Sequence, residues 1–152
     1  MTASSHTPGI PQKAGIAQSH VLGLDHLVLT VADIAATVAF YEGTLGFGVL
    51  RSPEGRFALD CGGQKINLHQ AGREFSPHAL RPVAGSGDFC CITAIAVEEL
   101  AEKLAARNVP LVAGPVTRTG RCGPLLSIYL RDPDGNLVEL ANRLDPVEDA
   151  LP

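Results

Sequence analysis

The chain has no excess of positive charge and no long apolar run, and each absence excludes a class of partner. Its 12 Lys and Arg are outnumbered by 16 Asp and Glu, which gives a net charge of −4 at pH 7. The few basic residues are scattered, so nucleic acid and anionic membranes are not expected partners. No apolar run approaches the roughly 20 residues that a membrane span needs, and the first 20 residues lack the apolar core of a signal peptide. We therefore expect a cytoplasmic protein.

Disulfide frameworks and CxxC motifs are also absent, although the chain has four cysteines. Cys90 and Cys91 are adjacent, so a strand would point them to opposite faces, and Cys61 and Cys122 stand alone. This arrangement is typical of small apolar side chains that fill space. The alternative is a nucleophilic Cys122, because two nearby arginines in the segment RTGRCG would favour its thiolate.

Length and apolar content limit the size of the fold. A chain of 152 residues with 45% hydrophobic content can bury a sizeable core, but it is too short for two ordinary domains. Two similar halves nevertheless follow each other along the chain. We predict flexible tails at 1–21 and 143–152 and a single domain at 22–142, which consists of module one (22–72), a linker (73–87) and module two (88–142).

Apolar periodicity in module one predicts the order β, α, β, β, β. Alternating residues and the turn signal Gly62-Gly63 predict strands at 24–31, 47–51, 56–61 and 64–70. A helix over 33–45 is predicted between the first two strands, capped by Asp33 and ended by Gly46. Its apolar stripe consists of Ile34, Val38, Tyr41 and Leu45.

Module two repeats that order after the Pro-, Gly- and Ser-containing linker. Strands are predicted at 88–95, 109–114, 123–131 and 136–142, with Arg118 in a loop and a turn at DPDG, 132–135. The helix between the first two strands has an apolar stripe of Val97, Leu100, Ala101 and Leu104. The predicted fold class is α+β, with two βαβββ modules that each form a half-open sheet.

Four residues that can bind a divalent metal occupy matching places in the two modules. His26 and Asp88 lie in the first strand of each module, and His69 and Glu139 lie in the last. Strand alternation puts His26, His69 and Glu139 on the face opposite the apolar one, and the assignment of Asp88 is weaker because it follows a Gly-Ser-Gly loop. Two imidazoles and two carboxylates suit Ni, Mn, Co, Fe or Zn, whereas an all-carboxylate set would favour Ca or Mg.

Two segments carry a resemblance to a known family. The opening LDHLVLTVADIAATVAFYEGTLGF and the closing YLRDPDGNLVELAN, together with the doubled βαβββ order, resemble the vicinal oxygen chelate superfamily. That superfamily includes glyoxalase I, extradiol dioxygenases, and fosfomycin and bleomycin resistance proteins. Within it, the segments INLHQAG and GPVTRTG make the chain look most like the small glyoxalase domain-containing or virulence-associated proteins. The resemblance covers about residues 22 to 142.

The resemblance implies a half-open cup of sheets around a metal, with ligands in the first and last strands of each module. Here those ligands are His26, His69, Asp88 and Glu139. The chain departs from bacterial glyoxalase I, in which the last strand of module one carries Glu and the first strand of module two carries His. Extradiol dioxygenases and fosfomycin resistance enzymes place a His where this chain has Asp88, so neither activity transfers directly.

The function expected from these residues is that of a metal-dependent glyoxalase-like lyase or isomerase. One divalent metal would chelate two neighbouring oxygens of a small substrate and stabilise an enediolate, with Glu139 as the base and Asp88 as the other candidate. The expected substrate contacts are Asn67, Arg118, Tyr129 and Arg131. A homodimer is expected, because the half-open sheets leave strand edges that a second copy would cover.

Two alternatives stay open at this point. An extradiol-type dioxygenase would use His26, His69 and Glu139 as a facial triad around Fe(II). A protein like the bleomycin resistance members would bind a drug or metabolite without turnover, although such proteins usually lack metal ligands. The sequence also leaves open whether the cup closes within one chain or between two chains.

Overall fold

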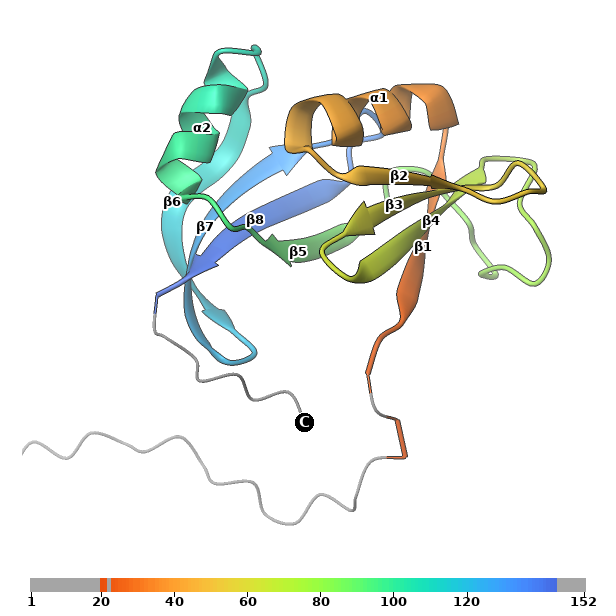
Figure 1. The fold of residues 1–152 in the computed structure, drawn as a ribbon, viewed down its shortest axis with the longest axis horizontal. Helices are drawn as coiled ribbons and strands as arrows, with labels where there is room; N and C mark the ends of the chain where they lie inside the picture. The colour runs from red at the N-terminus through yellow and green to blue at the C-terminus, as the bar shows by residue number, and fades with distance from the viewer. Residues whose placement is uncertain (1–19, 22, 145–152) are drawn as a thin grey trace, which may run out of the picture.

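The computed structural model describes residues 20, 21 and 23–144, so the tails predicted at 1–21 and 143–152 lie almost wholly outside the described residues. The described part forms two βαβββ modules, as predicted (Figure 1). Module one consists of β1 (His26–Val31), α1 (Ile34–Leu45), β2 (Gly48–Arg51), β3 (Phe57–Cys61) and β4 (Gln64–Gln70). Module two consists of β5 (Asp88–Ile92), α2 (Val97–Ala105), β6 (Leu111–Gly120), β7 (Gly123–Arg131) and β8 (Leu137–Arg143).

Each module makes its own four-stranded sheet. The strand orders are β1-β4-β3-β2 and β5-β8-β7-β6. In both modules the first strand pairs in parallel with the last, and the other neighbours are antiparallel. A parallel pair needs a crossover, and in each module that crossover contains the helix. The linker between the modules contains no helix or strand, as its composition predicts.

Alternation along the strands separates an apolar face from a polar one. In β4, Ile66 and Leu68 are at most 2% exposed, whereas Asn67 and His69 between and beside them are half-buried on the other face. Helix α1 packs on its own sheet and α2 on the other, so the helices cover the apolar faces (Figure 1). Buried side chains from both modules form one core cluster. The predicted assignment of strand faces is confirmed in β4.

Strand β6 is longer than predicted. The sequence indicated a strand over 109–114 and a loop around Arg118, but β6 continues to Gly120 and forms a hairpin with β7 through Arg121 and Cys122. Gly114-Pro115 resembles a strand end, yet the strand passes through it with two register shifts. Gly114 has a φ of 106°, and a Cβ there would collide with the backbone of β7. Gly114 therefore allows β6 to pass close to β7 at the irregularity, and the strand continues beyond it.

The DPDG turn between β7 and β8 links the two modules. Asp132 is 5% exposed and accepts hydrogen bonds from Asn136 and, at 3.0 Å, from the hydroxyl of Tyr41 in α1. Asp134 accepts from the backbone N–H of Ala32 at 3.1 Å, just after β1. Burial, followed by the charge of Asp132, raises the pKa of Tyr41. The β7–β8 turn of module two thus bonds to Ala32, just before α1, and to Tyr41 within α1.

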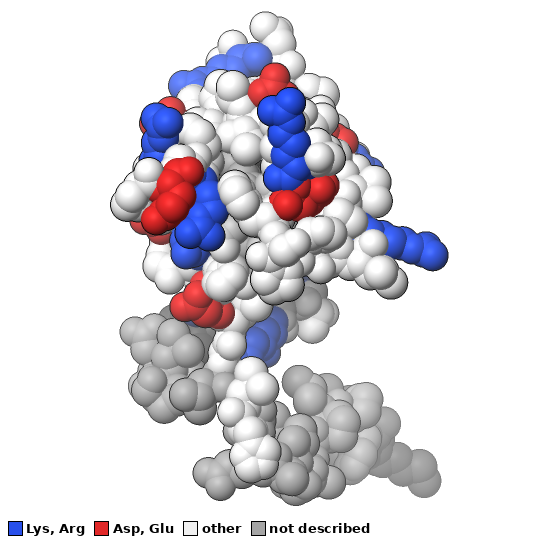
Figure 2. Space-filling view, turned by 90° about the vertical axis from the view of Figure 1, so that its right-hand side faces the viewer, with Lys and Arg blue, Asp and Glu red and all other residues white. Residues whose placement is uncertain are grey.

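The outer surface carries charges of both signs. On the face drawn in Figure 2, Lys and Arg side chains lie beside Asp and Glu side chains and form no patch of one sign. None of the helices in the described residues is both long and apolar enough to span a bilayer.

Candidate functional site

Each sheet carries a cavity on the side that its helix leaves uncovered. The module-two cavity has a volume of about 450 Å³ and is lined by β5, β7, β8 and the β6–β7 hairpin. The module-one cavity has a volume of about 340 Å³ and is lined by β2, β3, β4 and the linker residue Phe75. The two cavities contain different predicted site residues.

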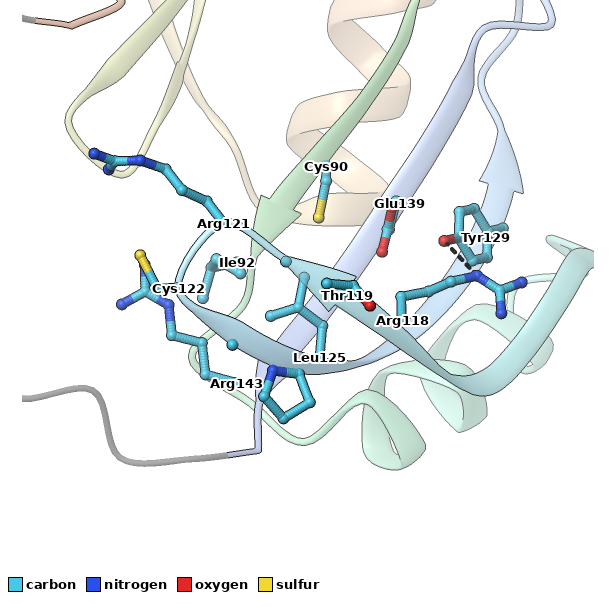
Figure 3. Close-up of a pocket in the computed structure, with 13 residues that line it drawn as sticks. Cys90, Ile92, Arg118, Thr119, Arg121, Cys122, Leu125, Tyr129, Glu139 and Arg143 are labelled. Atoms are coloured by element: carbon cyan, nitrogen blue, oxygen red, sulfur yellow. Dashed lines mark hydrogen bonds between the residues drawn. The ribbon is translucent and has the colours of Figure 1, made fainter. Parts of the chain in front are cut away.

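Glu139 lies in the middle of the module-two cavity (Figure 3). Its neighbours in β8 are buried in the core, so alternation directs its carboxylate into the cavity. The Ser127 hydroxyl from β7 donates a hydrogen bond to Glu139 Oε1 at 2.5 Å. Ser127 is fully buried and shares the cavity face of β7 with Leu125 and Tyr129, so its hydroxyl fixes the carboxylate from the neighbouring strand.

Tyr129 and Arg118 extend this group of polar side chains. Arg118 Nε donates to the Tyr129 hydroxyl at 3.2 Å, and the guanidinium carbon lies 5.5 Å from the centre of the tyrosine ring. Partial burial raises the pKa of the Tyr129 hydroxyl, Arg118 opposes that shift, and a hydrogen bond to Glu139 adds to it. The three side chains therefore form a chain of contacts from Arg118 through Tyr129 to Glu139.

Three titratable residues of the module-two cavity were not placed in the site from the sequence: Cys90, Arg121 and Arg143. Cys90 pairs with Glu139 across β5 and β8, and burial and the Glu139 carboxylate raise the pKa of its thiol to about 11. Arg143 could have been found, because it lies four residues after Glu139 in the same strand and alternation puts both on one face. Arg121 could not, because its segment was assigned to a loop.

His69 and Asn67 line the module-one cavity. The His69 ring meets the Phe75 ring edge-on, with 5.5 Å between centroids. His69 Nδ1 is buried and has no hydrogen-bond partner, which is uncommon for a buried polar atom. The Arg56 guanidinium lies over the Phe75 ring, with its central carbon 5.6 Å from the ring centre. An imidazole with an unsatisfied nitrogen beside a cavity fits a role in binding.

His26 lies at the start of β1, outside both cavities, with a side chain 43% exposed. Its Nδ1 lies 2.7 Å from Asp25 Oδ1, and the hydrogen bond from His26 lowers the pKa of Asp25. When Nδ1 donates to this carboxylate, Nε2 of the neutral ring is left as the acceptor that a metal binds. The orientation of His26 therefore fits a ligand role.

Asp88 lies apart from Glu139. It lines a third cavity of about 240 Å³ between β1 and β5, together with Thr30 and Arg81. Arg131, the fourth predicted substrate contact, is exposed and donates to the carbonyl of Gly135 at 2.9 Å. It lines neither the module-one nor the module-two cavity and anchors the turn before β8.

The four predicted metal ligands are not gathered by one chain. Within residues 20, 21 and 23–144, no three His, Cys, Asp or Glu side chains lie close enough to hold a metal ion. His69 and Glu139 line different cavities, and His26 and Asp88 lie outside both. The four side chains are donor types that a divalent metal accepts, but the described part of one chain does not bring them together.

Comparison with known proteins identifies the family that this architecture matches. Residues 23–140 match the family described as "Glyoxalase/Bleomycin resistance protein/Dioxygenase superfamily". The matched range contains all four predicted metal ligands and most of the residues that line the two cavities.

Individual relatives agree with this match. A virulence protein of Salmonella typhimurium is 49% identical over 78% of this chain and 82% of its own length. Its crystal structure superposes with a TM-score of 0.80 and covers 83% of this chain and all of that one. A glyoxalase domain-containing protein of Mycosarcoma maydis is 48% identical over 84% of this chain and 72% of its own length. Lactoylglutathione lyase of Salmonella typhimurium is 28% identical over 79% of this chain and 92% of its own length.

Proposed function

Because the chain belongs to the glyoxalase/bleomycin resistance protein/dioxygenase superfamily, we propose that it is a metal-dependent lyase or isomerase of the glyoxalase type. Its substrate would be a small molecule with two neighbouring oxygen atoms. The similarity to lactoylglutathione lyase along most of both chains supports this class of reaction. The proposal depends most on one observation, the Glu139 carboxylate that faces a cavity.

Glu139 is placed to move a proton. The buried Ser127 hydroxyl on the neighbouring strand β7 holds Oε1, so the carboxylate has a fixed position in the cavity. A carboxylate in that position can accept a proton from a carbon next to a carbonyl and return it to the neighbouring carbon. The Tyr129 hydroxyl, oriented by Arg118, is the group that can hydrogen-bond a substrate oxygen beside the base. Asp88, the other candidate base, lies in the third cavity.

One divalent ion, Ni, Mn, Co, Fe or Zn, would be held by His26, His69, Glu139 and, in the full set, Asp88. Two imidazoles and two carboxylates are a mixed nitrogen and oxygen donor set that these metals accept. The bound ion would supply Lewis-acid stabilisation of the negative charge that develops on the substrate oxygens.

The site would be completed between two copies of the chain. His69 and Glu139 line separate cavities in one chain, so a second copy would bring its module two against module one of the first. Apolar side chains that are 45–50% exposed, Val28, Leu50 and Ile92, would be covered by that contact. A two-fold symmetric dimer would contain two equivalent sites, each with imidazoles from one copy and a carboxylate from the other.

A mixing experiment tests this arrangement. His69→Ala and Glu139→Gln each remove one donor from every site of a pure dimer, so each variant alone should be inactive. When the two are unfolded and refolded together, half of the dimers are mixed and each contains one intact site, which predicts recovery of about a quarter of the activity. No recovery, with both variants folded and dimeric, would mean that each site forms within one chain.

The reaction class is tested by a substrate screen. The protein should act on hemithioacetals, lose this activity with chelator and regain it with Ni, Co or Mn. Ring cleavage of catechols with oxygen uptake as the sole activity would favour the dioxygenase alternative. Tight binding of a small molecule without turnover would favour the binding-protein alternative, and tightly bound stoichiometric metal would disfavour it.

A further inference from the structure

The charged residues of this chain are distributed unevenly between its cavities and the rest of the molecule. Of the 11 Lys and Arg among the described residues, six line the module-one and module-two cavities, whereas one of the 13 described Asp and Glu does so. Arg118, Arg121 and Arg143 line the module-two cavity, and Arg51, Arg56 and Lys65 line the module-one cavity. Because acidic residues are the majority in the chain, an even distribution would place more carboxylates than cations there. The excess of cations is therefore local to the cavities.

These cations are not neutralised by nearby carboxylates. The ion pairs among the described residues are His26–Asp25, Arg56–Glu54 and Lys103–Glu99. Of the six cavity cations, Arg56 is thus the one with a carboxylate partner. On the face drawn in Figure 2, acidic and basic side chains lie next to each other. Unpaired cations that line a concave surface raise its potential and attract anions.

Arg118 is also held in position. Its Nε donates to the Tyr129 hydroxyl and its Nη1 donates to the carbonyl of Thr117 at 3.2 Å, so its Nη2 remains for a ligand. Arg118 and Arg121 leave the β6–β7 hairpin in different directions, and Arg143 lies near the turn of the hairpin (Figure 3). Arginine is well suited to carboxylate and phosphate groups, because its planar guanidinium donates two parallel hydrogen bonds.

The position of Glu139 sets the direction in which a ligand would lie. Glu139 and Arg143 share a face of β8 four residues apart, which corresponds to roughly 13 Å along an extended strand. An anionic group next to Glu139 would be repelled, whereas one near Arg143 and Arg121 would be attracted. A ligand with its reactive oxygens at Glu139 and its anionic group several bonds away matches this arrangement.

We propose that the substrate is an anion whose carboxylate or phosphate group is bound by Arg121 and Arg143, with Arg118 beside the reacting end. This proposal rests on the proposed function for the location of the reacting end, and it names the substrate class that the catalytic proposal leaves open. Its direct test is anion binding, which requires neither activity nor metal.

The probes are inorganic phosphate and succinate, titrated by calorimetry into the metal-free full-length protein at low ionic strength. The variant Arg121→Gln/Arg143→Gln should weaken binding at least about tenfold, since each charge-assisted contact contributes to affinity. Arg73→Gln/Lys103→Gln is the matched control, because both side chains are exposed and line none of the three cavities. It removes two positive charges, as the test variant does, and should change binding less than about twofold.

Each outcome separates the two proposals. Tighter binding of phosphate or of succinate identifies the phosphate or the carboxylate as the preferred group, and either supports the inference. Absence of binding of both probes, or an equal loss in Arg73→Gln/Lys103→Gln and in Arg121→Gln/Arg143→Gln, overturns it. Anion binding without any metal-dependent activity would contradict the proposed function and leave the inference standing. Metal-dependent activity on neutral substrates, retained by Arg121→Gln/Arg143→Gln, would support the proposed function and contradict the inference.

Discussion

Modules one and two have the same topology, but their helices are stabilised in different ways. In module one, Asp33 caps α1 by accepting from the N–H groups of Ala35 and Ala36 at 2.8 and 3.2 Å, and Gly46 ends the helix in a left-handed conformation. Helix α2 begins after Ala96, which has no side-chain cap. Its start is held instead by Asn142 of β8. The start of the helix is thus capped by a neighbouring residue in module one and by a distant residue in module two.

Asn142 makes three hydrogen bonds in this role. Its Oδ1 accepts from the N–H of Val97 at 2.8 Å, and its Nδ2 donates to the carbonyls of Thr93 and Ile95 at 3.0 and 2.8 Å. The side chain of the last strand therefore ties down both ends of the segment that leads into α2. The N–H groups at the start of a helix are thus hydrogen-bonded by a neighbouring residue in module one and by a residue 45 positions away in module two.

The cavities differ between the modules in a complementary way. Module one provides an imidazole, His69, with an aromatic wall from Phe75, and module two provides a carboxylate, Glu139, with arginines around it. Neither cavity alone contains both kinds of donor. The two modules thus share a topology but line their cavities with different chemistry, and the following predictions test that difference.

The largest effect is expected for Glu139→Gln, which keeps the shape of the base and removes its charge. If Glu139 moves the proton, kcat/KM should fall by about 10²–10⁴-fold. Glu102→Gln, an exposed change in α2, is the control and should leave kcat/KM unchanged. Steady-state kinetics on the best substrate of the screen measure both. Full activity of folded Glu139→Gln would remove Glu139 from the role of base.

The second effect compares the two helix starts. Asn142→Ala removes three hydrogen bonds and leaves the N–H of Val97 unpaired, so it should lower the free energy of unfolding by about 2–3 kcal/mol. Asp33→Ala removes a local cap in an exposed position and should cost about 1 kcal/mol. Chemical denaturation of both variants gives the comparison. A larger loss for Asp33→Ala would show that the local cap matters more than the tertiary one.

The third effect compares the two tyrosines of the chain, one in each module. Tyr41→Phe removes the buried hydrogen bond to Asp132 and should lower the free energy of unfolding by about 1–2 kcal/mol. Tyr129→Phe should leave stability nearly unchanged, because its hydroxyl faces the module-two cavity, but it should lower activity. Thermal melts and kinetics on the same samples distinguish a structural tyrosine from a site tyrosine. Equal stability losses would contradict that division.

The smallest effect concerns the thiols of Cys61 in β3 and Cys91 in β5, which interact across the module boundary. Burial first, and the Cys61 thiol second, raise the pKa of Cys91 to about 12. Because folding favours the neutral thiol, the associated stability is present at neutral pH and is lost as pH rises from about 9 towards 12. In native protein at about pH 8.5, near the pKa of a free thiol, iodoacetamide should label exposed Cys122 first and Cys91 last. Mass spectrometry of the labelled peptides measures the order. Early labelling of Cys91 would show that the contact between β3 and β5 opens readily.

Much of the fold could be predicted because strands and helices have local periods. The alternation of Ile66 and Leu68 with Asn67 and His69 identified the faces of β4, and the helical spacing from Ile34 to Leu45 identified α1. Asp33 and Gly46 act within a few residues of their own position, so their capping roles were visible in the sequence. The length of β6 was not, because Gly114-Pro115 looks like a strand end unless the partner strand β7 is known.

The candidate site was only partly predictable. Glu139, Tyr129, His69 and Asn67 line cavities, as their strand faces suggested, and Arg118, which was expected in a loop, lines the module-two cavity from β6. The sequence pattern could not show that these residues divide between two cavities, because alternation gives the face of each strand but not the distance between sheets. Arg131 was expected beside them and instead bonds to the turn before β8, since its position at the end of β7 puts Gly135 within reach.

The sequence by itself determined the order of elements, the apolar face of each sheet, the turns at Gly62-Gly63 and DPDG, and the family. These features depend on residues that are near one another in the chain. Only the tertiary structure decided that Asp132 bonds to Tyr41, that Asn142 holds the start of α2, and that six cations surround two separate cavities. The physical reason is that these contacts join segments tens of residues apart, whose meeting depends on how the two sheets pack and not on any local pattern.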